Sequence, residues 1–454
     1  MTRCDRRLIL RGLAVTAAAT AAGLSARLSA SPSSTREEER RLHGPAPWQA
    51  ADFVGRIGVN VHLAQKGTVY DRYFESSILG AIEDLAVTQI RQGVYSPAPG
   101  VTDVLYQRMR ALTRMGCRFS VVCNDPSDQY VTTPPSALPR IHELCGGAID
   151  IVEGGNEPAL LADPVRNPTL SWRHQRDLHE TIRRDLPGSA IAVASPSYVQ
   201  GSIALARPLA GFVDRSNLHP YPGMEHPETG GPGRLSGFRE AMVPVCGTVE
   251  SIITETGYHT ALATASAHLP VSEEIRARYT PRLLLFAYLA GMRRTYLYEL
   301  RSSFGRGPAD PESAFGLLTH EGAPTAAYRA VKRLIALFSG PRGPAGVPAR
   351  ERPRLLQLAT VGDHRDVQAA AFRRGDGAVL LPLWLGVPGW DPATRTTRPP
   401  VTRRLRLEGA DGRNAVTLHR FDDEGGVRTE PVVLERGAGA IEISDRLTVL
   451  ELAA

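Results

Sequence analysis

The strongest constraint on the fold is a repeated alternation of short apolar runs and longer amphipathic runs between residues 56 and 338. The short runs are rich in β-branched residues and are bounded by turn residues, which is typical of buried strands. The longer runs place apolar residues at helical spacing. Eight strands are predicted, at 56–63, 88–95, 118–125, 148–158, 190–198, 213–222, 249–258 and 294–303. Helices are predicted at 76–87, 104–116, 136–145, 171–186, 281–292 and 323–338.

Eight strand-then-helix units predict an α/β fold of the (β/α)8 TIM-barrel type. The strands are apolar almost throughout, as is expected when both faces of a parallel sheet are buried. A doubly wound open sheet is the alternative. It is less favoured, because no glycine-rich phosphate loop follows the first strand.

The alternation of strand-like and helix-like runs ends at a Pro- and Gly-rich stretch at 338–353. Short strand-like runs follow, separated by turn sequences such as "GDG", "ADG" and "DEGG". We interpret this region as a small C-terminal antiparallel β-sandwich. The predicted organisation is a signal peptide at 1–30, a linker at 31–50, the barrel at 51–337, a second linker at 338–352 and the sandwich at 353–454.

The N-terminus has the layout of an export signal. A basic start is followed by an Ala-rich apolar stretch and then by small residues, and "DRRLILR" resembles the twin-arginine signal. An ordinary secretory signal or an uncleaved anchor is the alternative. The apolar stretch at 12–25 is shorter than the roughly 20 residues of a membrane span. A secreted or extracytoplasmic location, with no stable membrane span after cleavage, is therefore expected.

Charge does not indicate a nucleic-acid partner. The formal net charge is +6, but the first 30 residues hold five arginines against one aspartate, so only two positive charges remain beyond them. Beyond the predicted leader the cysteines are Cys117, Cys123, Cys145 and Cys246. Their spacing matches no metal site. A disulfide between Cys117 and Cys145 and buried free thiols are about equally expected.

Polar residues gather where the predicted strands end. In a (β/α)8 barrel the carboxyl ends of the strands form the active-site face. The residues at these ends are Asn60, His62, Arg91, Asn124, Asp125, Asn156, Glu157, His219, Tyr221, Glu255, Tyr298 and Glu299. Glu157 ends the fourth strand and Glu255 ends the seventh, so the two carboxylates are expected to face each other across the mouth. Such a pair suits cleavage of a glycosidic bond, in which one carboxyl protonates the leaving oxygen and the other attacks the anomeric carbon or activates water.

These residues resemble the retaining glycoside hydrolases of clan A. The resemblance rests on Asn156-Glu157-Pro158 at strand four, His219-Pro220-Tyr221 at strand six and Glu255 in "ITETGY" at strand seven. It covers roughly the barrel and extends to "FGLLTHEGAPTAAYRAV" at 315–331. It implies that Glu157 is the acid/base and Glu255 the nucleophile.

The same resemblance implies roles for the neighbouring residues. Asn156 would bind the sugar 2-hydroxyl, His219 and Tyr221 would orient the nucleophile and the substrate, and Arg91 would bond the nucleophile. The predicted substrate-binding set is completed by His62, Asn124, Tyr298, Glu299 and Trp172. Many clan members have a tryptophan at the end of strand eight, where this chain has "YLYEL". Trp172 could supply a stacking face instead, or it could pack against its own helix.

The sequence therefore predicts an exported retaining glycoside hydrolase that acts on β-glycosidic bonds and needs no cofactor. No metal site is predicted, because the loop-like stretch that holds His219, Glu225 and His226 has no helical i, i+4 pair. Two alternatives remain open: a barrel that binds carbohydrate without cleaving it, and a transglycosylase that uses the same residues. The expected partner is a carbohydrate, either an oligo- or polysaccharide or a glycoconjugate.

Overall fold

The computed structural model describes residues 47–100, 102–128, 130–340, 357–360, 366–408, 416–432 and 438–453. The predicted signal peptide, most of the first linker and nearly all of the second lie outside these residues. No helix among the described residues is long and apolar enough to cross a membrane.

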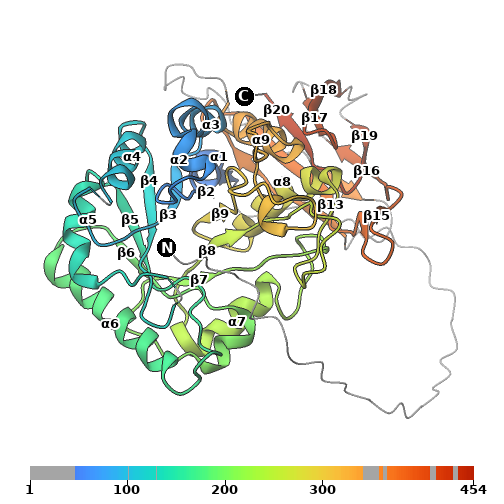
Figure 1. Ribbon diagram of the computed structural model, residues 1–454. Helices are drawn as coiled ribbons and strands as arrows, with labels where there is room; N and C mark the ends of the chain where they lie inside the picture. Colours follow the sequence, from blue (N-terminus) through green and yellow to red (C-terminus); the bar gives the residue numbers. More distant parts are fainter. Residues whose placement is uncertain are drawn as a thin grey trace, which may run out of the picture. The chain divides into compact units, whose positions relative to one another are not determined.

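Eight parallel strands form the nearly closed barrel that the sequence predicts (Figure 1). They are β2 (Ile57–Asn60), β3 (Gln89–Gly93), β4 (Arg118–Val122), β5 (Ile149–Glu153), β6 (Ala192–Ala194), β7 (Ser216–Leu218), β8 (Ser251–Thr256) and β9 (Thr295–Leu297). Their spatial order is β6-β5-β4-β3-β2-β9-β8-β7. The two edge strands are joined by a parallel bridge between Ala194 and Arg215, and Ser195 N–H donates to the Arg215 carbonyl at 3.0 Å.

Helices alternate with the strands around most of the barrel. They are α1 (Ala50–Gly55), α2 (Val69–Arg72), α3 (Leu79–Leu85), α4 (Asp103–Arg114), α5 (Leu138–Leu144), α6 (Asn167–Asp185), α7 (Leu235–Cys246), α8 (Glu273–Leu289) and α9 (Ala326–Ser339). A short π-helix, η1 (Phe74–Ile78), precedes α3, and short 3-10 helices lie at η2 (Pro135–Ala137) and η4 (Pro311–Ser313). Between β6 and β7 no helix was assigned from the sequence, and the chain forms the 3-10 turn η3 (Gln200–Leu205). The "GSIALARP" sequence there holds a glycine and a proline within eight residues, which disfavours an α-helix.

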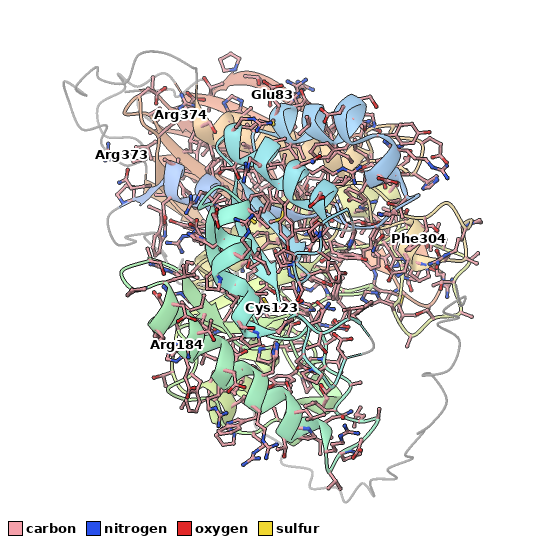
Figure 2. All side chains as sticks on the ribbon, turned by 60° about the vertical axis from the view of Figure 1, so that its left-hand side comes forward. Glu83, Cys123, Arg184, Phe304, Arg373 and Arg374 are labelled. Carbon is pink, nitrogen blue, oxygen red and sulfur yellow. The ribbon has the colours of Figure 1, made fainter. Side chains whose placement is uncertain are left out.

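Burial differs between the strand ends and the outer helices, as Cys123, just beyond β4, and Arg184, on α6, illustrate (both are labelled in Figure 2). Cys123 is fully buried, whereas the Arg184 side chain is 65% exposed. The four cysteines Cys117, Cys123, Cys145 and Cys246 are all buried free thiols, so the disulfide alternative is wrong.

Antiparallel sheets follow the barrel, as predicted. A seven-stranded sheet holds β11 (Val367–Ala369), β12 (Phe372–Arg373), β13 (Val379–Leu385), β17 (Val416–Phe421), β18 (Val427–Val432), β20 (Thr448–Leu452) and β1 (Trp48–Gln49). The last of these pairs in parallel with β12. A three-stranded sheet holds β10 (Gln357–Thr360), β16 (Arg403–Glu408) and β19 (Ala438–Ile443), and β14 (Trp390–Asp391) pairs with β15 (Thr396–Thr397).

Strand β13 shows how these sheets meet the barrel. Successive side chains of a strand point to opposite faces, and all seven residues of β13 are buried. Leu381 and Leu383 pack in the core between the two larger sheets, together with Leu405 and Ile443. Trp384, on the other face, belongs to the same apolar core as the barrel strands and helices. The continuous apolar run therefore reflects burial on both faces.

Helix α8 contacts the C-terminal part of the chain through buried arginines. Most of its residues are buried, including Arg276, Arg278 and Arg282. Arg278 pairs with Asp445 at 2.7 Å and with Asp423 at 2.8 Å. Arg282 donates to the Asp445 carbonyl at 2.9 Å. Buried guanidinium groups are tolerated only when they are paired in this way.

Candidate active site

The structure brings six of the predicted site residues into one hydrogen-bonded cluster at the carboxyl ends of the strands. They are Arg91, Asn156, Glu157, His219, Tyr221 and Glu255. They come from β3, the segment after β5, the segment after β7, and β8, which are far apart in sequence. The barrel topology is what places them together.

Glu255 is the more buried of the two predicted catalytic carboxylates, with its side chain 12% exposed. One carboxylate oxygen accepts from Arg91, and the other accepts from the Tyr221 hydroxyl at 2.8 Å. Burial alone would raise the pKa of Glu255. The charges of His219 and Arg91 and the hydrogen bonds from Tyr221 and Arg91 outweigh that effect and lower the pKa to about 2. Glu255 is therefore an ionised carboxylate at neutral pH.

Arg91 is buried and links four acceptors. Besides Glu255, its guanidinium donates to Glu153 at 3.0 Å, to Asn60 Oδ1 at 3.0 Å and to Asn156 Oδ1 at 2.7 Å. Asn60 lies directly opposite Arg91 in the ladder between β2 and β3, which accounts for that contact. The planar guanidinium thus fixes the orientation of the nucleophile candidate and of the Asn156 amide at once.

Glu157 lies in a tightly constrained loop just beyond β5. Its backbone has φ +49°, a left-handed conformation that is uncommon for a residue other than glycine. The conformation is held by its N–H, which donates to the Ser197 carbonyl at 2.9 Å. The preceding Gly155 is required sterically, because a Cβ there would lie 2.5 Å from Asp125 Oδ2. The side chain of Glu157 is 37% exposed, so it reaches the solvent-facing part of the mouth.

A chain of hydrogen bonds determines where the protons near Glu157 lie. Glu153 accepts from Arg91, so its carboxylate must face the amide nitrogen of Asn217, at 3.1 Å. Asn217 Oδ1 then accepts the Thr254 hydroxyl proton at 2.7 Å. His219 Nε2 must in turn donate to Thr254 Oγ1, at 2.9 Å.

The other ring nitrogen of His219 contacts Glu157. His219 Nδ1 lies 2.9 Å from Glu157 Oε1. Because Nε2 is the donor to Thr254, Nδ1 is the ring nitrogen that faces Glu157, and a hydrogen bond between the two needs one proton on either atom. The contact therefore places Glu157 where a proton can pass between it and His219, next to Glu255.

The two carboxylates are close together. One oxygen of Glu157, one of Glu255 and a ring nitrogen of His219 all lie within 4.8 Å of one another. Atoms of these types at this spacing could hold a metal ion. However, both oxygens of Glu255 already accept hydrogen bonds, one of them from the cationic Arg91, which disfavours a second cation at that carboxylate.

The predicted residues of the first and eighth strands form a second group beside this cluster. His62 Nε2 lies 3.1 Å from Glu299 Oε2, and the Tyr298 hydroxyl donates to Glu312 at 2.9 Å. Burial alone would lower the pKa of His62, but the close contact with the Glu299 carboxylate and the charge of that group outweigh this effect and raise the pKa. The Glu299 carboxylate also accepts from Ser303 N–H at 2.9 Å, so it is fixed in place.

Two predicted residues do not join either group. Asn124 is buried at the end of β4, where its carbonyl accepts from Thr133 N–H at 2.9 Å. Trp172 lies on the outer helix α6, its indole N–H donates to the Pro208 carbonyl at 2.9 Å, and its ring meets Phe212 edge to face. The structure gives Trp172 the packing alternative, so it is not brought to the cluster as a stacking face.

Sequence reasoning missed the buried part of the network. Glu153, Asn217 and Thr254 point into the barrel from β5, β7 and β8 and connect Arg91 to His219. The available signal was a charged or amide residue inside an otherwise apolar strand, as in "IDIVE" and "SNL". Each polar residue in such a strand requires a partner inside the barrel.

Comparison with solved structures identifies the same architecture in glycoside hydrolases. A family 39 glycoside hydrolase from Bacteroides cellulosilyticus WH2 is 16% identical, covers 89% of this chain and 82% of its own, and has a TM-score of 0.58. A GH30 endoxylanase from Clostridium papyrosolvens C71 is 11% identical, with 88% and 97% covered and a TM-score of 0.51. CelM2, a bifunctional glucanase-xylanase from a metagenome library, is 10% identical, with 92% and 98% covered and a TM-score of 0.52.

No protein-family model and no curated protein matches the chain. At 10–16% identity these structural neighbours establish a fold shared with glycoside hydrolases, and no more than the fold.

Proposed function

We propose that the chain is an exported retaining glycoside hydrolase that cleaves β-glycosidic bonds by double displacement. The observation that carries the proposal is the paired arrangement of Glu157 and Glu255. One oxygen of each lies within 4.8 Å of the other; Glu255 is held ionised by Arg91 and Tyr221, while Glu157 lies 2.9 Å from the Nδ1 atom of His219. Carboxyl groups about 5–5.5 Å apart suit the covalent route, whereas the inverting route needs about 6.5–9.5 Å.

In the first step Glu255 attacks the anomeric carbon and the bond from that carbon to the leaving oxygen breaks. The leaving oxygen takes the proton from Glu157, so the departing group leaves neutral. In the second step Glu157 removes a proton from water, and the water oxygen attacks the anomeric carbon. The bond to Glu255 then breaks, which restores both carboxyl groups.

The surrounding residues fit this division of labour. Arg91 and Tyr221 hold the Glu255 carboxylate in one orientation, which reduces the entropy lost in the attack. The Asn156 amide is oriented by Arg91 and is a suitable ligand for a sugar hydroxyl. The same proposal includes export by the twin-arginine-like signal at 1–30. It also includes the arrangement of the C-terminal sheets as a two-sheet β-sandwich.

The test is hydrolysis of a panel of aryl β-glycosides and polysaccharides by the mature protein, Glu157→Ala and Glu255→Ala. We expect each substitution to lower turnover about 100-fold or more. Azide added to the Glu255 variant should restore product as a glycosyl azide of inverted configuration, because azide replaces the missing nucleophile. Retained turnover in Glu255→Ala without azide would contradict the assignment.

Further comparisons within the panel test the acid/base role of Glu157 and distinguish hydrolysis from carbohydrate binding and from transglycosylation. With an activated aryl leaving group, Glu157→Ala should lose far less of the first step than with a sugar leaving group, because the aryl oxygen needs no proton. If the wild type cleaves no member of the panel but binds a polysaccharide, the protein is a carbohydrate-binding barrel. Transfer to added sugar acceptors in preference to water identifies a transglycosylase.

A further inference from the structure

The segment between β8 and α8 returns to the mouth of the barrel just beyond the nucleophile candidate. It leaves β8 after Thr256 and reaches α8 at Glu273. His268 lies in this segment, thirteen residues after Glu255. Its ring packs edge to face on the Tyr221 ring, with centroids 4.7 Å apart and planes at 80°. Since Tyr221 donates to Glu255, His268 adjoins the reacting cluster directly.

The backbone of His268 is fixed on both sides. Its N–H donates to Ser266 Oγ at 3.1 Å, and its carbonyl accepts from His259 Nε2 at 2.8 Å. His259 Nδ1 accepts from Ala261 N–H at 3.2 Å, so the proton of the neutral His259 ring is on Nε2. Burial lowers the pKa of His259 to about 4, which keeps that ring neutral.

The ring of His268 is fixed as well. It lies 5.2 Å from the Phe315 ring with the planes tilted by 36°, and 5.4 Å from the ring of His259. Together with the Tyr221 contact these rings confine the imidazole on three sides. A side chain confined in this way loses little further entropy when it binds a ligand.

The imidazole nitrogens of His268 remain free for another partner. Among the described residues neither ring nitrogen hydrogen-bonds to a protein group, although the backbone groups on both sides of the ring are paired. Burial lowers the pKa of His268, and the charges of Glu157 and Glu255 oppose the shift without cancelling it. The ring is therefore within electrostatic reach of both carboxylates and, when neutral, offers one donor and one acceptor.

We propose that His268 is a substrate-binding residue whose imidazole hydrogen-bonds a hydroxyl of the sugar unit held between Glu157 and Glu255. The proposal rests on the glycosidase function proposed above. A sugar hydroxyl is the matching ligand, because it can accept from one ring nitrogen or donate to the other and carries no charge that the adjacent carboxylates would repel.

The experiment compares His268→Phe, His268→Gln and the wild type on the aryl glycoside that the wild type cleaves and on its monodeoxy analogues. Phenylalanine keeps an aromatic ring against Tyr221 and Phe315 but removes both nitrogens. We expect His268→Phe to lower kcat/KM about tenfold on the parent glycoside, the size of one lost hydrogen bond. His268→Gln, which retains a donor and an acceptor, should recover part of that loss. His142→Phe, on α5, is the matched control and should have wild-type kcat/KM.

The deoxy analogues supply a readout that a purely structural role would not change. For the analogue that lacks the contacted hydroxyl, the wild type and His268→Phe should have the same kcat/KM, while the other analogues keep the tenfold difference. An equal loss on every analogue, or no loss on the parent glycoside, overturns the proposal. If His268→Phe does not fold, the same pattern with a smaller difference is read from His268→Gln, because glutamine recovers only part of the lost hydrogen bond. If the wild type cleaves no glycoside, the glycosidase function itself fails and this inference falls with it.

Discussion

The bond from Tyr221 to Glu255 gives the sharpest quantitative prediction. The hydroxyl donates to the Glu255 carboxylate at 2.8 Å in a buried site, and it is one of the causes that lower the pKa of Glu255 to about 2. Tyr221→Phe removes this donor and keeps the ring. A hydrogen bond to a charged group contributes about 1.5–3 kcal/mol, and one pKa unit corresponds to about 1.4 kcal/mol. The pKa of Glu255 should therefore rise by about one to two units.

The sign follows from which protonation state the hydroxyl stabilises. The hydrogen bond favours the ionised carboxylate, so losing it favours the protonated form and raises the pKa. Protonated Glu255 cannot attack, so the acidic limb of the pH dependence of kcat/KM moves to higher pH in Tyr221→Phe, by about one to two units. A ¹³C NMR titration of the glutamate carboxyl groups measures the same shift without a substrate.

Tyr298→Phe is the matched control. It makes the same chemical change at the same mouth, but the Tyr298 hydroxyl donates to Glu312. Its acidic limb should coincide with that of the wild type, even if substrate binding weakens. The reasoning is refuted if Tyr221→Phe leaves the limb in place, or if both substitutions move it equally.

Two further substitutions test packing near the site and at the junction between barrel and sheets. Gly155→Ala puts a methyl group 2.5 Å from the Asp125 carboxylate, which the Ser127 N–H holds in place, so the loop that bears Glu157 must move. We expect a loss of about 1–3 kcal/mol in the free energy of unfolding and lower activity. Gly93→Ala is the control: nothing lies within 4 Å of the added methyl group, so neither quantity should change. Trp384→Phe removes the donor to Glu228 at 2.6 Å across the junction between barrel and sheets, and urea unfolding should show a loss of about 1–3 kcal/mol. An unchanged midpoint in the Trp384 variant would mean that this junction does not stabilise the fold.

Much of the barrel could be predicted from the sequence because a parallel strand buried on both faces is a continuous apolar run. All eight predicted strands are present, from Ile57 to Leu297. The connection between β6 and β7 was not predicted, because its apolar residues pack in a 3-10 turn with little periodicity.

Only part of the candidate site could be predicted from the sequence. Residues at strand ends, such as Glu157 and Glu255, could be placed on one face of the barrel from topology alone. The partners of Arg91 inside the barrel could not, because the contact of Glu153 with Asn217 depends on the register between strands that are not neighbours in sequence. His268 was missed for a different reason: it lies in a long loop, and its position is set by ring contacts with Tyr221 and Phe315.

The most direct test of the central claim is to trap the covalent intermediate. The wild type would be incubated with the 2-deoxy-2-fluoro analogue of a cleaved aryl β-glycoside, digested, and its peptides sequenced by mass spectrometry. The account predicts one added fluoroglycosyl group on Glu255, with release of one equivalent of the aryl alcohol. A label on Glu157 or on another residue, or turnover of the parent glycoside to a product of inverted configuration, would contradict it.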